Sequence, residues 1–297
     1  MAAQSLALAP TVATRREGAH RATLRDYWAL TKPEVNLLIV MTTGAAFCMA
    51  QPNLAPQSLG GLVHTLAGTL LVASGAAALN QWMERRLDAR MRRTARRPVA
   101  SGRLPPTHAL VSGVALSLAG ICQLLFAVGP LPSLLALATL LSYLLLYTPL
   151  KRITPLCTLV GAFPGAIPPL IGWTAAGAPL DRQAWLLFAV LFLWQLPHFM
   201  AIAWMYRDDY ERAGYLVLPR GEVRSRFVTV QTLAPLLLLV LATIAFGAAA
   251  VLLSLAFLRF GLRFLLRRSA ADARSLLLAS IVYLPALLTL GVFRGHL

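Results

Sequence analysis

Apolar residues follow one another in long blocks along this chain, and short polar segments separate the blocks. A helix that crosses the hydrocarbon core of a bilayer needs about 20 consecutive apolar residues, and most of the blocks have roughly this length. The pattern therefore predicts an all-α membrane protein with about nine transmembrane helices in one bundle. The helices are expected at residues 34–51, 61–82, 108–127, 131–150, 157–175, 184–206, 228–246, 248–266 and 275–293.

The stretch from Val228 to Leu266 is long and has no polar break that would serve as an ordinary loop. As one helix it would be about 58 Å long, nearly twice the thickness of the hydrocarbon core. Both of its ends are flanked by arginines and should therefore lie on the same side of the membrane. A tight hairpin near Gly247 satisfies both conditions, because glycine adopts the backbone angles of a sharp turn at little cost.

The composition excludes an ordinary soluble domain, since 58% of the residues are hydrophobic and only 13% are charged. The formal net charge of +16 would by itself suggest a nucleic-acid-binding protein. The basic residues lie between the apolar blocks, however, so the expected surroundings are a lipid bilayer and no nucleic-acid partner is expected. We interpret residues 1–30 as a basic, flexible cytoplasmic tail and residues 31–297 as one polytopic domain.

The basic residues also predict the orientation of the chain. Of the 27 Lys and Arg residues, all except Arg182 and Arg294 fall in the tail or in alternate connections on one side of the expected bundle. Connections rich in Lys and Arg stay in the cytoplasm. The N-terminus should therefore be cytoplasmic and the C-terminus outside, and we expect the chain in the cytoplasmic (inner) membrane of a bacterium.

The strongest polar signal is the segment 80–102 at the end of the second apolar block. Asn80, Glu84 and Asp88 are spaced by four residues, so on a helix they lie within roughly 80° of one another and span about 12 Å. Oxygen ligands of this kind suit Mg²⁺, which is usually shared between carboxylates and substrate phosphates. Arg93 and Arg97 follow, and guanidinium groups bind phosphate oxygens. The segment therefore predicts a site for a polyphosphate with divalent cations.

A second polar segment, 194–214, is expected to leave the membrane on the same side as the first. Its adjacent acids, Asp208 and Asp209, point in different directions on a helix, so one of them can bind metal while the other caps a helix or pairs with arginine. A metal site between the two segments is the functional interpretation, and a solvated loop of mixed charge is the alternative.

His198 lies ten residues before Asp208, about 15 Å deeper if the helix continues. Gln195 precedes it by one turn, and Pro197 should kink the helix or free a carbonyl group. Polar groups at this depth usually face the bundle interior. Two interpretations remain open: a hydrogen bond between helices, or a cavity for a large substrate with polar edges.

The segment 80–102 resembles the signature of the UbiA superfamily of intramembrane prenyltransferases. The run Trp194 to Phe199, with the segment from Asp208 to Gly214, looks like the branch of that superfamily that farnesylates haem B. Glu84 stands where many relatives have Asp, and Tyr206 and Tyr210 occupy the ends of the second motif, where relatives have acids. The positions that fit the first motif are Asn80, Glu84, Asp88, Met91, Arg93, Thr94, Arg97, Pro98 and Gly102, and the segments 31–33 and 147–152 agree with the same branch.

The resemblance implies that a farnesyl group moves from farnesyl diphosphate to a vinyl group of haem B, which is a substrate and not a cofactor. Mg²⁺ is the implied cofactor, and a haem A synthase or an oxidase assembly factor is the implied partner that receives the product. The implied metal ligands are Asn80, Glu84, Asp88, Asp208 and Asp209. Of the two adjacent aspartates, either one could complete the metal site.

The resemblance also implies which side chains contact the substrates. Arg93 and Arg97, with Lys151 or Arg152, would bind the departing diphosphate, and His198 would contact the haem. An aromatic face of Trp82, Tyr147 or Trp204 would steady the allylic cation. The other implied substrate contacts are Thr94, Tyr206 and Tyr210.

Two other functions compete with this one. A prenyltransferase could instead act on an aromatic or quinone precursor, but the run from Trp194 to Phe199 favours haem. A transporter should carry ionisable groups near the bilayer midplane on several helices. In this sequence the acids gather at one side of the membrane and only His198 is expected to lie deep, which favours an enzyme.

Overall fold

The computed structural model describes residues 22–51 and 56–295, and within these ranges the chain is helical and contains no strand. Eight segments are long and apolar enough to cross a membrane. The protein is therefore a multi-pass membrane protein, as predicted. The long helices are α2 (Pro33–Ala50), α3 (Pro56–Asp88), α4 (Pro106–Ala127), α5 (Pro130–Leu141), α9 (Arg182–Met205), α11 (Val223–Ala242), α12 (Ala248–Arg267) and α13 (Ala270–Gly295).

The ninth expected helix, 157–175, is present as two short helices. α7 (Cys157–Ala166) ends just before α8 (Pro168–Ala175) begins. Pro168 and Pro169 lack the amide hydrogens that a continuous helix would use, which explains the break at this point. With this broken pair counted as one element, the described bundle agrees approximately with nine helices.

The hairpin expected near Gly247 is confirmed. α11 ends in a 3₁₀ turn (Thr243–Phe246), and α12 starts at Ala248. Gly247 between them has φ 89° and ψ 176°, a combination that only glycine adopts without strain.

The two helices with the closest packing are α3 and α4, and glycines allow their backbones to touch. A Cβ atom at Gly120 would lie 2.6 Å from the carbonyl oxygen of Gly68, and one at Gly113 would lie 2.7 Å from Leu79. Small residues let membrane helices approach and gain van der Waals contact. This contact fixes α3, the 33-residue helix whose C-terminal end carries the acidic motif.

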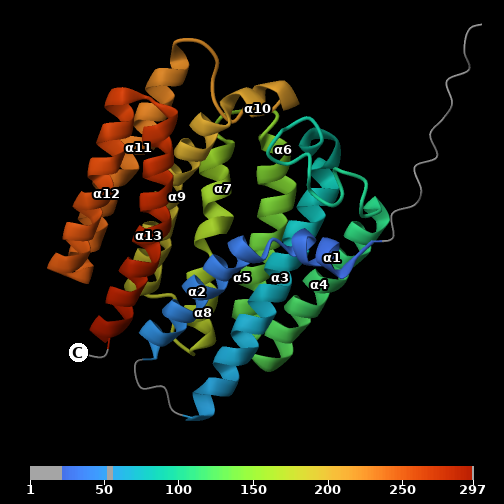
Figure 1. The fold of residues 1–297 in the computed structure, drawn as a ribbon. Coiled ribbons are helices and arrows are strands. Elements are labelled where there is room, and N and C mark those ends of the chain that lie inside the picture. Colours follow the sequence, from blue (N-terminus) through green and yellow to red (C-terminus); the bar gives the residue numbers. More distant parts are fainter. Residues whose placement is uncertain (1–21, 52–55, 296–297) are drawn as a thin grey trace, which may run out of the picture.

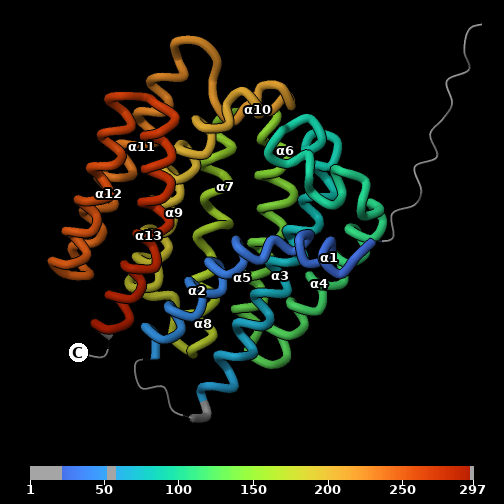
Figure 2. Tube along the Cα trace, in the orientation of Figure 1, coloured from blue at the N-terminus to red at the C-terminus, as the bar shows by residue number. Residues whose placement is uncertain are grey.

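One end of the bundle collects the polar segments (Figures 1 and 2). The turn after α3, the short helix α6 (Thr148–Leu150) and α10 (Arg207–Ala213) lie together there, although they are far apart in the sequence. We refer to it as the polar end. Between α5 and α6 the chain forms a π-helix, Ser142–Tyr147.

Part of the N-terminal segment is also ordered against this end. Residues 1–21 of the expected tail lie outside the described residues, whereas Leu24–Thr31 form α1. Leu30 of α1 is buried, and Arg103 Nε lies 2.8 Å from Asp26 Oδ1. The hydrogen bond from Arg103 lowers the pKa of Asp26 to about 2, so this ion pair stays formed at neutral pH.

Candidate active site

The last three turns of α3 hold the three polar residues of the acidic motif. Asn80, Glu84 and Asp88 are only 1%, 5% and 2% exposed. A buried carboxylate without a partner would cost several kcal/mol, and each acid has a basic partner. Lys151 Nζ lies 2.8 Å from Glu84 Oε1, and Arg97 Nη1 lies 2.7 Å from Asp88 Oδ2. The structure thus brings together three of the expected catalytic residues and two of the expected diphosphate-binding cations.

The chain after α3 folds back over the end of that helix. The Thr94 hydroxyl donates to the carbonyl oxygen of Asp88 at 2.9 Å, and Gly102 turns the loop with φ 78°. This fold returns Arg97 to Asp88, nine residues earlier in the chain. Thr94, which was expected to contact substrate, is buried and stabilises the loop.

The π-helix positions Lys151. The Lys151 ammonium lies 4.5 Å from the centre of the Tyr147 ring, a cation–π contact. Tyr147 packs against Gly161 of α7, where a Cβ atom would be 2.6 Å from Tyr147 Cε2. π-Helical turns occur frequently at functional sites, because the extra residue re-aims the side chains that follow. Arg152, the alternative to Lys151, is exposed.

Lys32 also belongs to the site, although the sequence analysis did not name it among the residues that contact a substrate. Its Nζ donates to Asn80 Oδ1 at 3.2 Å, and its backbone has φ 53° and ψ 62°, the left-handed region that non-glycine residues avoid. Pro33 follows, and the residue before a proline is disfavoured in the right-handed helical region. Burial, with the nearby charge of Arg97, lowers the pKa of Lys32 to about 7. The signal for it was the Thr-Lys-Pro run at residues 31–33.

Their surroundings shift the pKa values of Lys151 and Lys32 in opposite directions. Burial disfavours the ammonium form of Lys151, but the Glu84 carboxylate outweighs that effect and raises the pKa of Lys151 well above its ordinary value.

Burial also raises the pKa of Tyr215, whose buried hydroxyl has no hydrogen-bond partner among the described residues. Tyr215 is thus a neutral hydroxyl near the acidic motif.

The second polar segment meets the first through Asp209. Asp209 is 8% exposed and accepts from the backbone N–H of Arg93 at 3.2 Å and from Arg212 Nη1 at 2.9 Å. The side chain of Asp208 is 80% exposed and lies 3.5 Å from Arg207. The structure therefore distinguishes the two adjacent acids, since only Asp209 faces the first motif.

Tyr206 and Tyr210 hold the side chain of Arg93. Its guanidinium lies 5.1 Å from the centre of the Tyr206 ring, and Nη2 donates to the Tyr210 hydroxyl at 3.3 Å. The tyrosines that replace acids in the second motif thus face Arg93 of the first. The structure brings both tyrosines to the site as expected, through an arginine.

His198 and Gln195 both take part in contacts between helices. His198 Nδ1 lies 2.7 Å from the Ser280 hydroxyl of α13, and the ring stacks on Trp194 with centres 5.1 Å apart. Gln195 Nε2 donates to the Ala162 carbonyl of α7 at 3.3 Å. The structure therefore contains the hydrogen bonds between helices that were one of the two expectations for these residues. Contact of His198 with a substrate stays a prediction.

Of the three aromatic residues expected to steady the allylic cation, Tyr147 lies beside the Glu84–Lys151 ion pair. Trp82 packs near the buried side chain of Leu30. Trp204 Nε1 donates to the carbonyl of Arg268 at 3.0 Å, so it fastens the connection between α12 and α13.

The donor set suits Mg²⁺ at α3 better than at α10. Among the described residues, no three or more His, Cys, Asp or Glu side chains come together as a metal cluster. Glu84 and Asp88 are two buried carboxylates on one helix face, and Mg²⁺ is commonly bound by one or two carboxylates with water and substrate phosphates completing its shell. Asp209 is bonded to arginine groups and Asp208 points to solvent, and metal binding by either acid stays a prediction.

Three basic side chains, from three separate parts of the chain, lie beside the residues of the acidic motif. They are Lys32, Arg97 and Lys151, and Arg93 stands in the same loop as Arg97. Such an arrangement can bind a polyanion with more charge than the two acids supply, in particular a diphosphate bridged to them by a divalent cation.

Comparison with known proteins gives matches over most of the chain. The UbiA prenyltransferase family matches residues 38–282 of the chain. The "Protoheme IX farnesyltransferase" of Solibacter usitatus is 46% identical over 279 residues, which cover 88% of this chain and 96% of that protein. The protein of the same name from Koribacter versatilis is 44% identical over 283 residues, 89% of this chain and 91% of its own. A UbiA homolog from Archaeoglobus fulgidus, solved with GPP and Mg²⁺, has the same fold at a TM-score of 0.63 and 15% identity, covering 91% of this chain and 99% of that one.

Proposed function

The chain belongs to the UbiA prenyltransferase family, and we propose that it transfers a farnesyl group from farnesyl diphosphate to a vinyl group of haem B. The observation that carries the proposal is the buried pair of carboxylates at the end of α3, each bound to a cation that a diphosphate can also use. The acceptor and the length of the prenyl group are supported by the relatives named "Protoheme IX farnesyltransferase".

We propose Mg²⁺ as the cofactor, with Asn80, Glu84 and Asp88 as the side chains that would hold it. Bound there, Mg²⁺ would neutralise the charge that develops on the departing diphosphate. The neighbour from Archaeoglobus fulgidus, which was solved with both GPP and Mg²⁺, supports this assignment. Asp209 supports the site indirectly, because it holds the backbone of Arg93 in place.

The cations of the chain bind and orient the leaving group. Lys151 uses one of its three ammonium hydrogens on Glu84, which leaves two for phosphate oxygens. Arg97 has five N–H donors, of which Asp88 takes one at Nη1. Lys32 adds a donor beside Asn80, and Tyr206 and Tyr210 hold the Arg93 guanidinium. Preorganised donors of this kind stabilise the charge formed in the transition state.

The reaction breaks the bond between C1 of the farnesyl chain and the diphosphate oxygen, and the electron pair leaves with diphosphate. The vinyl group of haem B then forms the new bond to C1. Water adds to the resulting cation and loses a proton, which gives the hydroxyethylfarnesyl group of haem O. The apolar helices shield the allylic cation from bulk water until the vinyl group has attacked.

His198 is our candidate for the haem contact. The Ser280 hydroxyl donates to the Leu277 carbonyl at 2.6 Å, so it accepts from Nδ1 of His198. The second ring nitrogen, Nε2, then carries a lone pair. A neutral imidazole in this tautomer is a common ligand for haem iron.

We propose that the polar end faces the cytoplasm of a bacterial inner membrane, with the N-terminus inside and the C-terminus outside. Among the described residues, the connections at this end carry most of the Lys and Arg residues, which is the arrangement the positive-inside rule describes. A haem A synthase or an oxidase assembly factor would then take the product from the same membrane.

The test is turnover by the purified protein. Incubation with haem B, farnesyl diphosphate and Mg²⁺ should yield a haem heavier by one farnesyl group and one water, and chelation of Mg²⁺ should stop the reaction reversibly. Asp88→Asn and Arg97→Ala should each abolish product, because the transition state needs these charges at the phosphate oxygens. Size-exclusion chromatography of each variant in detergent checks that it is folded, since breaking this buried ion pair also costs stability. Wild-type rates in either variant would refute the diphosphate site, and a product formed only with aromatic or quinone acceptors would refute haem as the substrate.

A further inference from the structure

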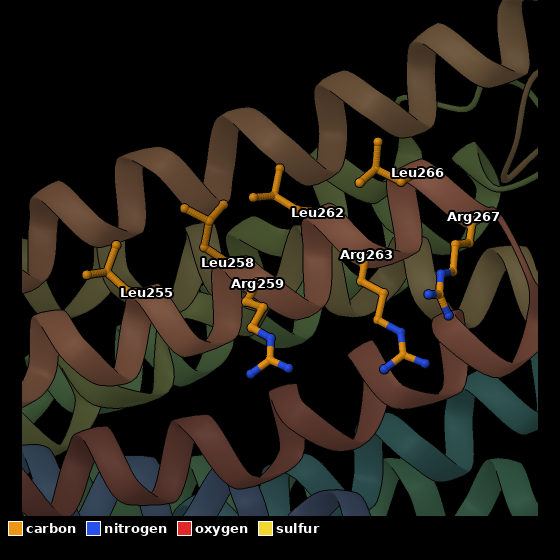
Figure 3. A pocket seen from close by; sticks show the side chains of 7 residues that line it. All are labelled: Leu255, Leu258, Arg259, Leu262, Arg263, Leu266 and Arg267. Atoms are coloured by element: carbon orange, nitrogen blue, oxygen red, sulfur yellow. The ribbon is translucent and has the colours of Figure 1, made fainter.

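A shallow groove runs along α12, at the edge of the bundle and away from the acidic motif (Figures 1 and 3). Its volume is about 370 Å³. In Figure 3 leucines project from one edge of the helix and arginines from the other, toward α13. The side chains that matter below are Leu255, Leu258, Leu262, Arg259, Arg263 and Arg267.

The arginines form a ladder that descends from the polar end into the membrane. Arg267 is the last residue of α12, and Trp204 bonds the next residue of the chain to the end of α9. Arg263 and Arg259 follow at steps of four, about 6 Å and about 12 Å deeper. All three side chains belong to exposed residues of a helix that is apolar enough to span the bilayer.

The charges of this ladder are only partly balanced. Arg263 Nε lies 2.6 Å from Asp272 Oδ1 of α13. For Arg259 and Arg267, no carboxylate among the described residues lies within ion-pair distance. An arginine two turns inside a membrane helix is costly unless it reaches an anion at the interface. With Asp272 counted, the groove carries a formal charge of about +2.

The apolar edge of the groove is equally open. Leu255 and Leu262 are 45% and 41% exposed, and Leu258 lies between them on the helix. α12 packs against α11 and α13, and its remaining side faces away from the bundle. An occupant with an anionic head and an apolar chain would satisfy both edges at once.

We propose that this groove binds one anionic phospholipid of the surrounding bilayer. The phosphate group lies against Arg259 and Arg267, and an acyl chain lies along the leucines. Basic sites between membrane helices near the interface have this chemistry. The bound lipid supplies the counter-charge that the chain itself lacks at this position, and it fastens the outermost helix to the bundle.

The test measures lipid retention by the full-length protein in detergent, with phosphatidylglycerol and phosphatidylcholine of matched acyl chains as probes and native mass spectrometry as the readout. The wild type should retain phosphatidylglycerol in preference to phosphatidylcholine. Arg259→Gln with Arg267→Gln should weaken phosphatidylglycerol retention about thirtyfold, since each arginine near a lipid surface contributes about one factor of five. Arg263 is left unchanged, because its loss would strand the buried Asp272 carboxylate.

Two further variants keep the result decisive. Arg220→Gln with Arg226→Gln removes the same charge from exposed positions outside the groove and should retain the lipid as the wild type does. Arg259→Lys with Arg267→Lys keeps the charge and should retain most of the binding. Equal retention of the two lipids by the wild type, or equal losses in the groove and control variants, would overturn the proposal. Unchanged phosphatidylglycerol retention in the Arg259→Gln with Arg267→Gln variant would overturn it as well.

Discussion

At the scale of single residues, two adjacent aspartates show how one step along a short helix separates two environments. Successive residues of α10 point about 100° apart, so Asp209 turns toward the Arg93 backbone while Asp208 turns to solvent. Charge alone does not distinguish them. Burial and hydrogen bonding distinguish them, so the same loss of charge should have different effects at Asp208 and at Asp209.

We expect Asp209→Asn to lower kcat for farnesyl transfer about 100-fold, because a small displacement of Arg93 at the diphosphate site has an effect of this size. Asp208→Asn is the matched control, with the same chemical change at an exposed position, and should keep the wild-type rate. Steady-state kinetics of both variants checks the prediction. Equal losses in the two would mean that the acids act through the net charge of the segment.

Lys32 carries a second prediction at this scale. Lys32→Met keeps most of the side-chain volume and removes the ammonium group beside Asn80, so kcat/KM for farnesyl diphosphate should fall about 10- to 100-fold. Arg152→Met removes a cation from an exposed position four residues after Thr148 and should have little effect. The idea fails if both variants retain wild-type kcat/KM at comparable thermal stability.

At the scale of elements, the π-helix before α6 is the part of the fold that aims a catalytic cation. It delivers Tyr147 under the Lys151 ammonium, and α7 leaves room for that ring only because residue 161 is glycine. Interiors packed this closely transmit a change in one element to its neighbour. The position of Lys151 therefore depends on a residue that bears no chemistry of its own.

Gly161→Ala should destabilise the protein by about 1–3 kcal/mol and lower the rate of transfer, since its methyl group would overlap the Tyr147 ring. Gly60→Ala, in an open part of α3, is the control and should leave both properties unchanged or raise stability slightly. Thermal unfolding in detergent and turnover together check this. An unchanged rate in the Gly161 variant would show that the position of Lys151 does not depend on the packing of Tyr147.

At the scale of the whole molecule, the two ends of the bundle differ in charge, and this difference decides how the chain lies in the membrane. A reporter fused after Ala178 should be found outside the cytoplasm, and one fused between residues 83 and 107 should be found inside, because the latter connection carries eight arginines. Enzymatic reporters that are active in only one compartment make the measurement. The reverse pattern would put the diphosphate site on the wrong side of the membrane for our proposal.

Much of this arrangement could be predicted from sequence, because a bilayer imposes a length and a polarity on every helix that crosses it. The apolar blocks predicted the long helices, and the length of the stretch around Gly247 predicted its hairpin. The break between α7 and α8 was not predicted, since the hydropathy of residues 157–175 is continuous and only the paired prolines mark it.

The site could be predicted only in part, for a different physical reason. The spacing of Asn80, Glu84 and Asp88 was readable because all three lie on one helix. The roles of Lys32 and of Asp209 depend on contacts between segments that are 48 and 116 residues apart in the chain, and no local pattern encodes such contacts.

The length of α3 has a consequence for how the two substrates meet. Its 33 residues extend about 50 Å, whereas the hydrocarbon layer is about 30 Å thick, so the helix is longer than that layer. The buried acids lie in its last turns at the polar end, where a diphosphate can arrive from water, while a prenyl chain can remain in the lipid below. Neither reactant has to leave the phase it prefers, and the protein acts as a catalyst at a phase boundary.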